Sequence, residues 1–122
     1  MSIQHFLTLS DLPYEDIRAI VARASELKKN PSTAASLSRK TLGLVFEKSS
    51  TRTRVAFEVA MTQMGGSSLF LRNSDSQLGR GEPVEDTSRV LSRIVDCLAV
   101  RTDKHSKLET FAQYSQVPVV NA

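Results

Sequence analysis

Hydrophobic residues recur along the chain at two spacings, which predict alternating helices and strands. Apolar residues three or four positions apart predict a first helix that is introduced by residues 10–13, a capping residue and a proline, and ends near Lys29. The same spacing predicts helices over about 51–64, after Pro83 up to about 94, and around 108–114. Short apolar runs predict buried strands at 41–46, 67–71, 97–100 and 117–120.

The order of these elements predicts the fold class. One helix comes first, three strand–helix pairs follow, and a strand comes last. Strands that alternate with helices pair in parallel through right-handed crossovers. We therefore expect an α/β fold, a three-layer open parallel sheet of about four strands with helices on both faces. Residues 72–81 contain many turn formers and predict a mobile loop.

Length and composition indicate one domain without a membrane span. The 122 residues are 40% hydrophobic, which is enough for one ordinary core. The longest apolar run is far shorter than the roughly 20 residues that cross a bilayer, and the start of the chain resembles neither a signal peptide nor a transit sequence. We therefore expect a cytoplasmic protein with one domain over residues 1–122.

Charge and the rarer side chains disfavour several function classes. A net charge of +3, with two tyrosines, five phenylalanines and no tryptophan, does not provide the basic stripe and stacking surface of a nucleic-acid binder. Cys97 is the single cysteine, so no internal disulfide can form, and its apolar surroundings predict a buried, unreactive thiol. His5 and His105 lack the spacing of a metal site, and we expect surface or capping roles for both.

The candidate chemistry lies where the first predicted strand is followed by the second helix. Residues 50–54 place three hydroxyl groups and two guanidinium groups at a helix start, where backbone N–H groups and the helix dipole favour an anion such as phosphate. Arg101 ends the third strand, and in open α/β sheets ligands gather at the carboxyl ends of the strands. We therefore expect these two segments to face the same anion.

A purely structural role fits the same spacing. Ser50 could be an ordinary N-cap, and Arg52, Arg54 and Arg101 could be solvated surface charges. Arg54 could pair with Glu58 one turn further along the helix. Spacing alone leaves both interpretations open.

Three segments resemble the transcarbamylase family. Residues 46–54 (FEKSSTRTR) are similar to its carbamoyl-phosphate signature, and their Phe-Glu-Lys opening resembles the ornithine branch, since the aspartate branch usually carries Pro before Ser-Thr-Arg-Thr. Residues 76–83 with 86–93 resemble the loop and helix of bacterial ornithine carbamoyltransferases, and residues 100–106 form a third match. The matches follow the family's order from about His5 to Asn121, so the resemblance covers nearly the whole chain.

The resemblance implies a role for each matching residue. The phosphate of carbamoyl phosphate would be held by four consecutive residues, Ser50, Thr51, Arg52 and Thr53. Arg101 would bridge the phosphate and the carbonyl oxygen, so Arg52 and Arg101 would be the catalytic residues. Gln77 would bind the same ligand from a loop that reaches the active site of the adjacent subunit in a homotrimer.

Members of the family are longer than this chain. After the fourth strand they carry a His-Pro-x-Gln segment and a second, ornithine-binding domain, and we expect this C-terminal domain to be absent here because the chain stops at Ala122. The resemblance implies that the complete enzyme transfers the carbamoyl group from carbamoyl phosphate to the δ-amine of L-ornithine in arginine biosynthesis, with no cofactor. We expect the chain alone to bind carbamoyl phosphate without turnover.

Two other functions stay open. The enzyme could be another transcarbamylase that uses aspartate, putrescine or an acylated ornithine, because the second substrate is bound by the domain outside this chain. The chain could also be a non-catalytic, anion-binding module that forms trimers.

Overall fold

A four-stranded parallel sheet forms the centre of the structure. The computed structural model describes residues 3–30, 36–72 and 81–122. The strands are β1 (Thr41–Phe46), β2 (Ser67–Arg72), β3 (Cys97–Arg101) and β4 (Val119–Asn121), in the spatial order β2-β1-β3-β4. Every neighbouring pair is parallel, and Phe6 adds an isolated parallel bridge to Val120. The parallel sheet predicted from the sequence is confirmed.

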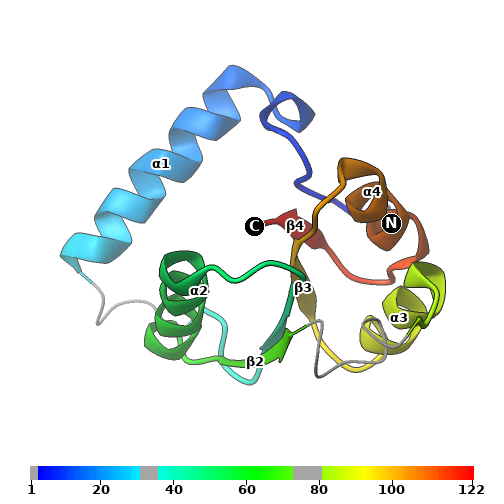
Figure 1. Cartoon of the computed structure of the whole chain (residues 1–122). Helices are drawn as coiled ribbons and strands as arrows, with labels where there is room; N and C mark the ends of the chain where they lie inside the picture. Colours follow the sequence, from blue (N-terminus) through cyan, green and yellow to red (C-terminus); the bar gives the residue numbers. More distant parts are fainter. Residues whose placement is uncertain (1–2, 31–35, 73–80) are drawn as a thin grey trace.

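Helices cover both faces of this sheet (Figure 1). The helices of the structure are α1 (Tyr14–Lys29), α2 (Thr51–Gln63), α3 (Val84–Leu91) and α4 (His105–Tyr114), and a 3-10 turn, η1 (Leu9–Asp11), precedes α1. α2 lies against one face, whereas α3 and α4 lie against the other. The predicted three-layer α/β fold is therefore confirmed. Within the described ranges, no helix is long and apolar enough to span a membrane.

The side chains of β1 alternate between two hydrophobic clusters, one on each face of the sheet. Leu44 and Phe46 belong to the cluster on the α2 side, which includes Met61 of that helix. Val45 belongs to the cluster on the opposite side, which includes Phe111 of α4. Successive strand residues point to opposite faces. Because both faces of β1 are covered, its sequence is continuously apolar rather than alternating.

The pairing of β1 with β3 brings the carboxyl ends of the two strands together. Phe46 pairs with Arg101 in the ladder, and the N–H of Glu47 donates a 2.8 Å hydrogen bond to the carbonyl of Arg101. The connections into α2 and into α4 therefore leave the sheet at the same edge. The candidate functional groups lie at this edge.

α1 carries the predicted apolar stripe but stands apart from the sheet (Figure 1). None of its residues is buried, and the side chains of Ile20 and Val21 are among the exposed large hydrophobic groups, at 48% and 62%. A helix with such a stripe normally buries it against a partner. The helix itself was predicted, and its end at Lys29 is confirmed.

The residues predicted to introduce α1 form a separate turn. α1 begins at Tyr14 with Pro13 at the N-cap position. The carboxylate of Asp11 instead accepts hydrogen bonds of 2.7 and 3.1 Å from the N–H groups of Leu7 and Thr8, which closes η1. These backbone hydrogen bonds lower the pKa of Asp11, because they stabilise the ionised carboxylate.

Three other boundaries differ from the predictions by more than one residue. α3 ends at Leu91, before the predicted limit near Ile94. α4 begins at His105, whereas apolar spacing indicated it only from residue 108, because the first turn is mostly polar. β4 begins at Val119 rather than at residue 117, directly after Pro118, which has no N–H group to donate to a ladder.

Two adjacent glycines follow α2, and the structure requires each for a different reason. Gly65 has a φ of 87°, a left-handed conformation that glycine adopts without strain, so the predicted stop is confirmed. At Gly66, an added Cβ atom would lie 2.9 Å from the carbonyl oxygens of Leu37 and Lys40. The backbone therefore passes close to the segment before β1 without room for a side chain.

Cys97 is only partly buried, so the predicted burial of its thiol was wrong. It lies at the start of β3 and lines a mainly apolar cavity of about 440 Å³ together with Leu42, Phe57 and Met61. Burial raises the pKa of the thiol, which keeps it protonated at neutral pH. A protonated thiol is a poor nucleophile, which agrees with the predicted lack of reactivity.

His5 connects the amino-terminal segment to β4. Its Nδ1 accepts a 3.0 Å hydrogen bond from the N–H of Val119, so the imidazole is neutral in this arrangement. Burial lowers the pKa of His5. His5 is partly exposed and accepts a backbone N–H group, so the predicted surface or capping role is confirmed in part for His5, and His105 is exposed at the start of α4 as predicted.

We predict that protonation of His5 destabilises the fold. Because its folded-state pKa lies below the value of 6.5 for an unperturbed histidine, the unfolded chain binds more protons as the pH falls below that value. The free energy of unfolding should therefore decrease on acidification from about pH 7 to about pH 5.5, as measured by urea unfolding. His5→Gln, which keeps an acceptor but does not titrate, should reduce this dependence, and His105→Gln should retain it. An equal dependence in both variants would contradict the prediction.

Candidate anion-binding site

The connection from β1 ends in the first turn of α2. Ser50 has φ −159° and ψ 86°, outside the helical region, and the helix begins at Thr51. Its first hydrogen bond runs from the N–H of Arg54 to the carbonyl of Ser50, at 3.1 Å. The N–H groups of residues 51–53 therefore precede the helical ladder, as the first N–H groups of an α-helix do. Such groups favour an anion.

Ser50 occupies the N-cap position without acting as a cap. Its side chain makes no capping hydrogen bond to α2, although serine is one of the residues that most often provide one. The alternative in which Ser50 is an ordinary N-cap is therefore wrong. The hydroxyl is not used to stabilise the helix start.

Arg101 reaches the first turn of α2 from the end of β3. Its Nη1 atom lies 3.5 Å from Oγ1 of Thr53 and donates a 3.1 Å hydrogen bond to the carbonyl of Ala122. The contact with Thr53 is at the long limit for a hydrogen bond, so it places the guanidinium group without binding it strongly. The prediction that these two segments converge at one edge of the sheet is confirmed.

Arg54 is held within the fold. Its Nε atom donates a 3.1 Å hydrogen bond to Oε2 of Glu58, and its guanidinium carbon lies 3.7 Å from the centroid of the Phe70 ring. The pair with Glu58 that the sequence suggested is confirmed, whereas the contact with Phe70 was not predicted. These contacts connect α2 to β2 and assign Arg54 a structural role.

The structure describes three of the remaining predicted site residues and not the fourth. Thr51 and Arg52 are exposed on the first turn of α2, and Thr53 is partly buried beside Arg101. Gln77 lies outside the described residues, as does nearly all of the predicted mobile loop. The structure thus brings together the site residues from two of the three family-like segments.

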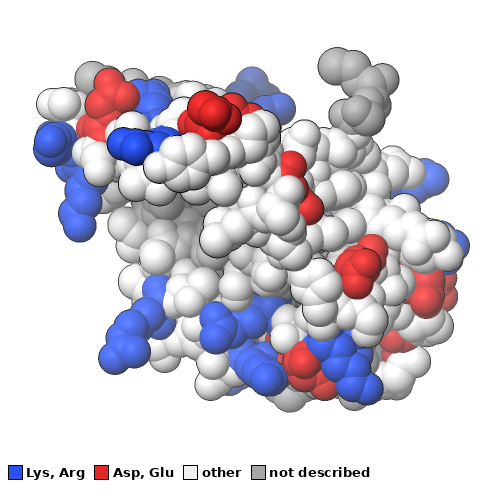
Figure 2. Space-filling model, turned by 90° about the horizontal axis from the view of Figure 1, so that it is seen from above, with Lys and Arg blue, Asp and Glu red and all other residues white. Residues whose placement is uncertain are grey.

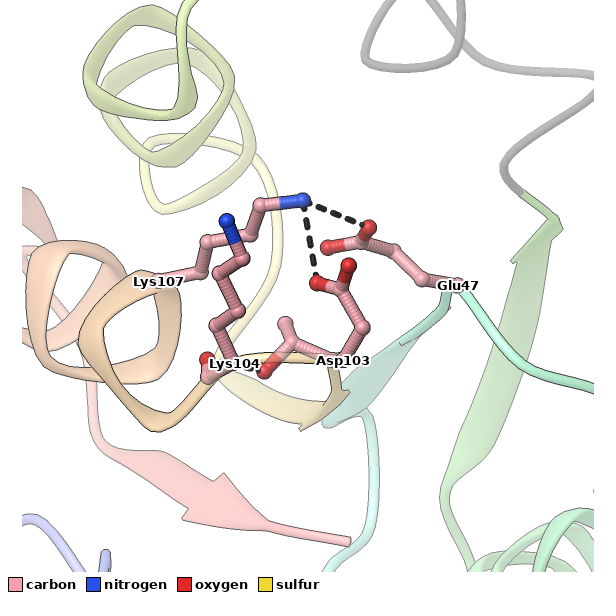
Figure 3. A network of polar contacts seen from close by, with 5 residues as sticks. Glu47, Asp103, Lys104 and Lys107 are labelled. Atoms are coloured by element: carbon pink, nitrogen blue, oxygen red, sulfur yellow. Dashed lines mark hydrogen bonds and ion pairs between the residues drawn. The ribbon is translucent and has the colours of Figure 1, made fainter.

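A salt-bridge cluster that the sequence analysis missed lies at the same edge (Figure 3). Oε2 of Glu47, directly after β1, accepts a 2.9 Å hydrogen bond from Nζ of Lys107 in the first turn of α4. The same Nζ lies 3.1 Å from Oδ1 of Asp103. The sequence could have indicated this cluster only through topology, because the residue after β1 and the first turn of α4 both lie at the carboxyl edge of the sheet.

The charge distribution favours local recognition over a broad electrostatic surface. Figure 2 shows Lys and Arg side chains interspersed with Asp and Glu on the face that it presents. In the parts of the chain that the structure describes, no group of three or more His, Cys, Asp or Glu side chains could hold a metal ion. The groups that an anion would meet at the start of α2 are backbone N–H groups, hydroxyls and guanidinium groups.

Comparison with known proteins assigns this domain to a family. The model for the carbamoyl-P binding domain of aspartate/ornithine carbamoyltransferase matches residues 4–122. The chain belongs to the aspartate/ornithine carbamoyltransferase family. Both the start of α2 and the end of β3 lie inside the matched region, so the candidate anion site belongs to the carbamoyltransferase domain.

Curated relatives in this carbamoyltransferase family are longer than the chain. The ornithine carbamoyltransferase of Nitrosococcus oceani is 59% identical over 125 residues, which cover 100% of this chain and 41% of that protein. The ornithine carbamoyltransferase of Methylococcus capsulatus is 58% identical over 121 residues, covering 99% of this chain and 41% of that protein. The chain thus spans about two-fifths of the length of these relatives.

Solved structures from both branches of the carbamoyltransferase family share the fold. The crystal structure of anabolic ornithine carbamoyltransferase from Campylobacter jejuni has a TM-score of 0.92 at 53% identity, covering 98% of this chain and 39% of that one. The catalytic subunit of aspartate transcarbamoylase from M. jannaschii has a TM-score of 0.86 at 32% identity, covering 98% and 40%. The fold is common to both branches, and the sequence is more similar to the ornithine example.

We predict that Ser50→Ala leaves the free energy of unfolding unchanged within about 0.5 kcal/mol, because no capping hydrogen bond is lost. A serine that caps a helix would cost roughly 0.5–2 kcal/mol when replaced. Urea unfolding measures the difference. Ser88→Ala is a positive control, since its buried hydroxyl donates a 2.7 Å hydrogen bond to the carbonyl of Phe111, and it should lower stability by about 1–3 kcal/mol. A cap-sized loss in Ser50→Ala would disprove the assignment.

Proposed function

We propose that this chain is the carbamoyl-phosphate-binding domain of an ornithine carbamoyltransferase. The observation that carries the proposal is the convergence of Arg101 with the first turn of α2 at one edge of the sheet. Membership of the carbamoyltransferase family supports carbamoyl phosphate as the anion bound there.

In this proposal the phosphate lies against the first turn of α2. Its oxygens accept hydrogen bonds from the N–H groups of that turn and from the side chains of Ser50, Thr51, Arg52 and Thr53. Arg101 approaches from the end of β3, so its fork of donors can reach both the phosphate and the carbonyl oxygen of the ligand. The first turn of α2 would bind the phosphate, and Arg101 would contact both the phosphate and the carbonyl oxygen.

The complete enzyme would use this arrangement to stabilise developing charge. The neutral δ-amine of L-ornithine attacks the carbonyl carbon, the bond from that carbon to the phosphate oxygen breaks, and the proton lost by the amine nitrogen ends on the released phosphate. Negative charge grows on the carbonyl oxygen and on the departing phosphate. Donors fixed at a helix start and at a strand end stabilise this charge without reorganising. The reaction needs no cofactor, because phosphate is the leaving group.

Sequence similarity supports ornithine as the acceptor. Identity is 58–59% to two ornithine carbamoyltransferases and 32% to an aspartate transcarbamoylase. The Phe-Glu-Lys opening of the signature, residues 46–48, supports the same branch. The acceptor itself would be bound by a second domain beyond this chain. The residues that would distinguish ornithine from putrescine or an acylated ornithine would therefore lie in that domain.

We extend the proposal to assembly and cellular role on the same similarity. The enzyme would be a homotrimer or a multiple of trimers in which Gln77 contributes to the neighbouring subunit's site. It would act in the cytoplasm in arginine biosynthesis, with no nucleic-acid or membrane partner. One structural relative is described as anabolic, which supports the biosynthetic direction.

We predict that the chain binds carbamoyl phosphate more tightly than inorganic phosphate, as measured by isothermal titration calorimetry. Arg101→Ala should remove this preference, because the carbonyl oxygen loses its donor. Arg18→Ala, which removes the same charge from exposed α1, is the matched control and should retain it. Equal affinity of the unchanged chain for the two ligands would instead indicate the non-catalytic anion module.

We predict that Arg52→Ala lowers turnover of the complete carbamoyltransferase carrying this sequence by about 100- to 1000-fold, the usual effect of removing one donor to the transition state. Citrulline formation under saturating substrates measures turnover. Arg23→Ala on α1 is the control for loss of charge and should leave turnover near normal. Near-normal turnover in Arg52→Ala would contradict the proposal. The chain by itself should form no citrulline, because the acceptor-binding groups lie outside it.

A further inference from the structure

Lys107 lies where the helix alone would disfavour a lysine. It belongs to the first turn of α4, and the positive end of the helix dipole favours acidic side chains there. The pKa of Lys107 is nevertheless raised, because Glu47 and Asp103 both accept hydrogen bonds from its ammonium group. Two carboxylates outside the helix therefore hold this lysine in place.

Glu47 depends on Lys107 for charge compensation. Its side chain is only 9% exposed, and Oε2 is the oxygen that accepts the hydrogen bond from Lys107. Oε1 is buried and has no hydrogen-bond partner among the described residues. A nearly buried carboxylate is costly when its cationic partner is removed, because the charge is then left uncompensated. The fold is therefore constrained to keep these two groups together.

The cluster joins segments that lie next to Arg101, since Glu47 follows the paired strand β1 and Asp103 follows β3 (Figure 3). The N–H of Glu47 donates its 2.8 Å hydrogen bond to the carbonyl of Arg101, and Asp103 follows Arg101 in the connection to α4. Lys107 binds both carboxylates, at 2.9 and 3.1 Å. The ammonium group of Lys107, in the first turn of α4, thus joins Glu47, directly after β1, to Asp103, two residues after Arg101.

We propose that Lys107 is a positioning residue that sets where the guanidinium group of Arg101 lies relative to the first turn of α2. It acts through Glu47 and Asp103 and does not touch the ligand. The inference rests on the proposed function, in which the start of α2 binds the phosphate and Arg101 also reaches the carbonyl oxygen. Displacement of Arg101 therefore weakens binding of carbamoyl phosphate more than binding of inorganic phosphate.

Lys107→Met tests this inference, because it keeps an unbranched apolar side chain and removes the ammonium group. The dissociation constant for carbamoyl phosphate should rise about tenfold, whereas that for inorganic phosphate should change less than about threefold. Lys107→Arg should restore the preference, since it keeps the charge. Lys104→Met is the matched control, an exposed lysine near the same turn, and should leave both constants within about twofold. Titration calorimetry on the 122-residue chain provides all the constants.

Each outcome decides the inference. Unchanged constants in Lys107→Met, or equal weakening of both ligands, would overturn it, because a general loss of charge or stability acts on both anions alike. If Lys107→Met does not fold, Asp103→Asn removes the more exposed carboxylate and should weaken carbamoyl phosphate alone, by about threefold. Failure of the proposed function is distinguishable, because the unchanged chain would then show no preference for carbamoyl phosphate.

Discussion

The parallel pairing of β1 with β3 is the constraint on which the rest of the structure depends. It aligns Phe46 with Arg101, and the hydrogen bond from Glu47 to the carbonyl of Arg101 continues this alignment past the end of β1. Because β1 is buried on both faces, a shift of one residue would exchange Leu44 and Val45 between the two hydrophobic clusters. The packing of the core therefore also determines which residues meet at the candidate site.

The sequence contained enough information to predict this framework. The limits of β1 were predicted correctly, because a short continuous apolar run is typical of a strand buried on both faces. Errors occurred where the local signal was weak or had another use. The polar first turn of α4 carried no apolar periodicity, and Asp11 closed a separate turn before α1. Cys97 was misjudged because an apolar neighbourhood in sequence does not establish burial in space.

The candidate site was predictable in location but only partly in detail. Residues at the start of α2 and the end of β3 could be assigned to one edge from topology alone. Topology could not show that the guanidinium group of Arg54 lies over the ring of Phe70, or that Ser50 makes no capping hydrogen bond. Glu47 and Lys107 are 60 positions apart, and a contact between side chains so distant in the chain depends on the completed fold.

The exposure of α1 has a thermodynamic consequence. An isolated helix of this length is marginal in water, and most helices gain their stability from an apolar face that packs against other elements. α1 has that face but buries none of its residues. Its backbone hydrogen bonds should therefore open at a smaller free energy than those of the sheet, which would give the helix less protection against hydrogen exchange.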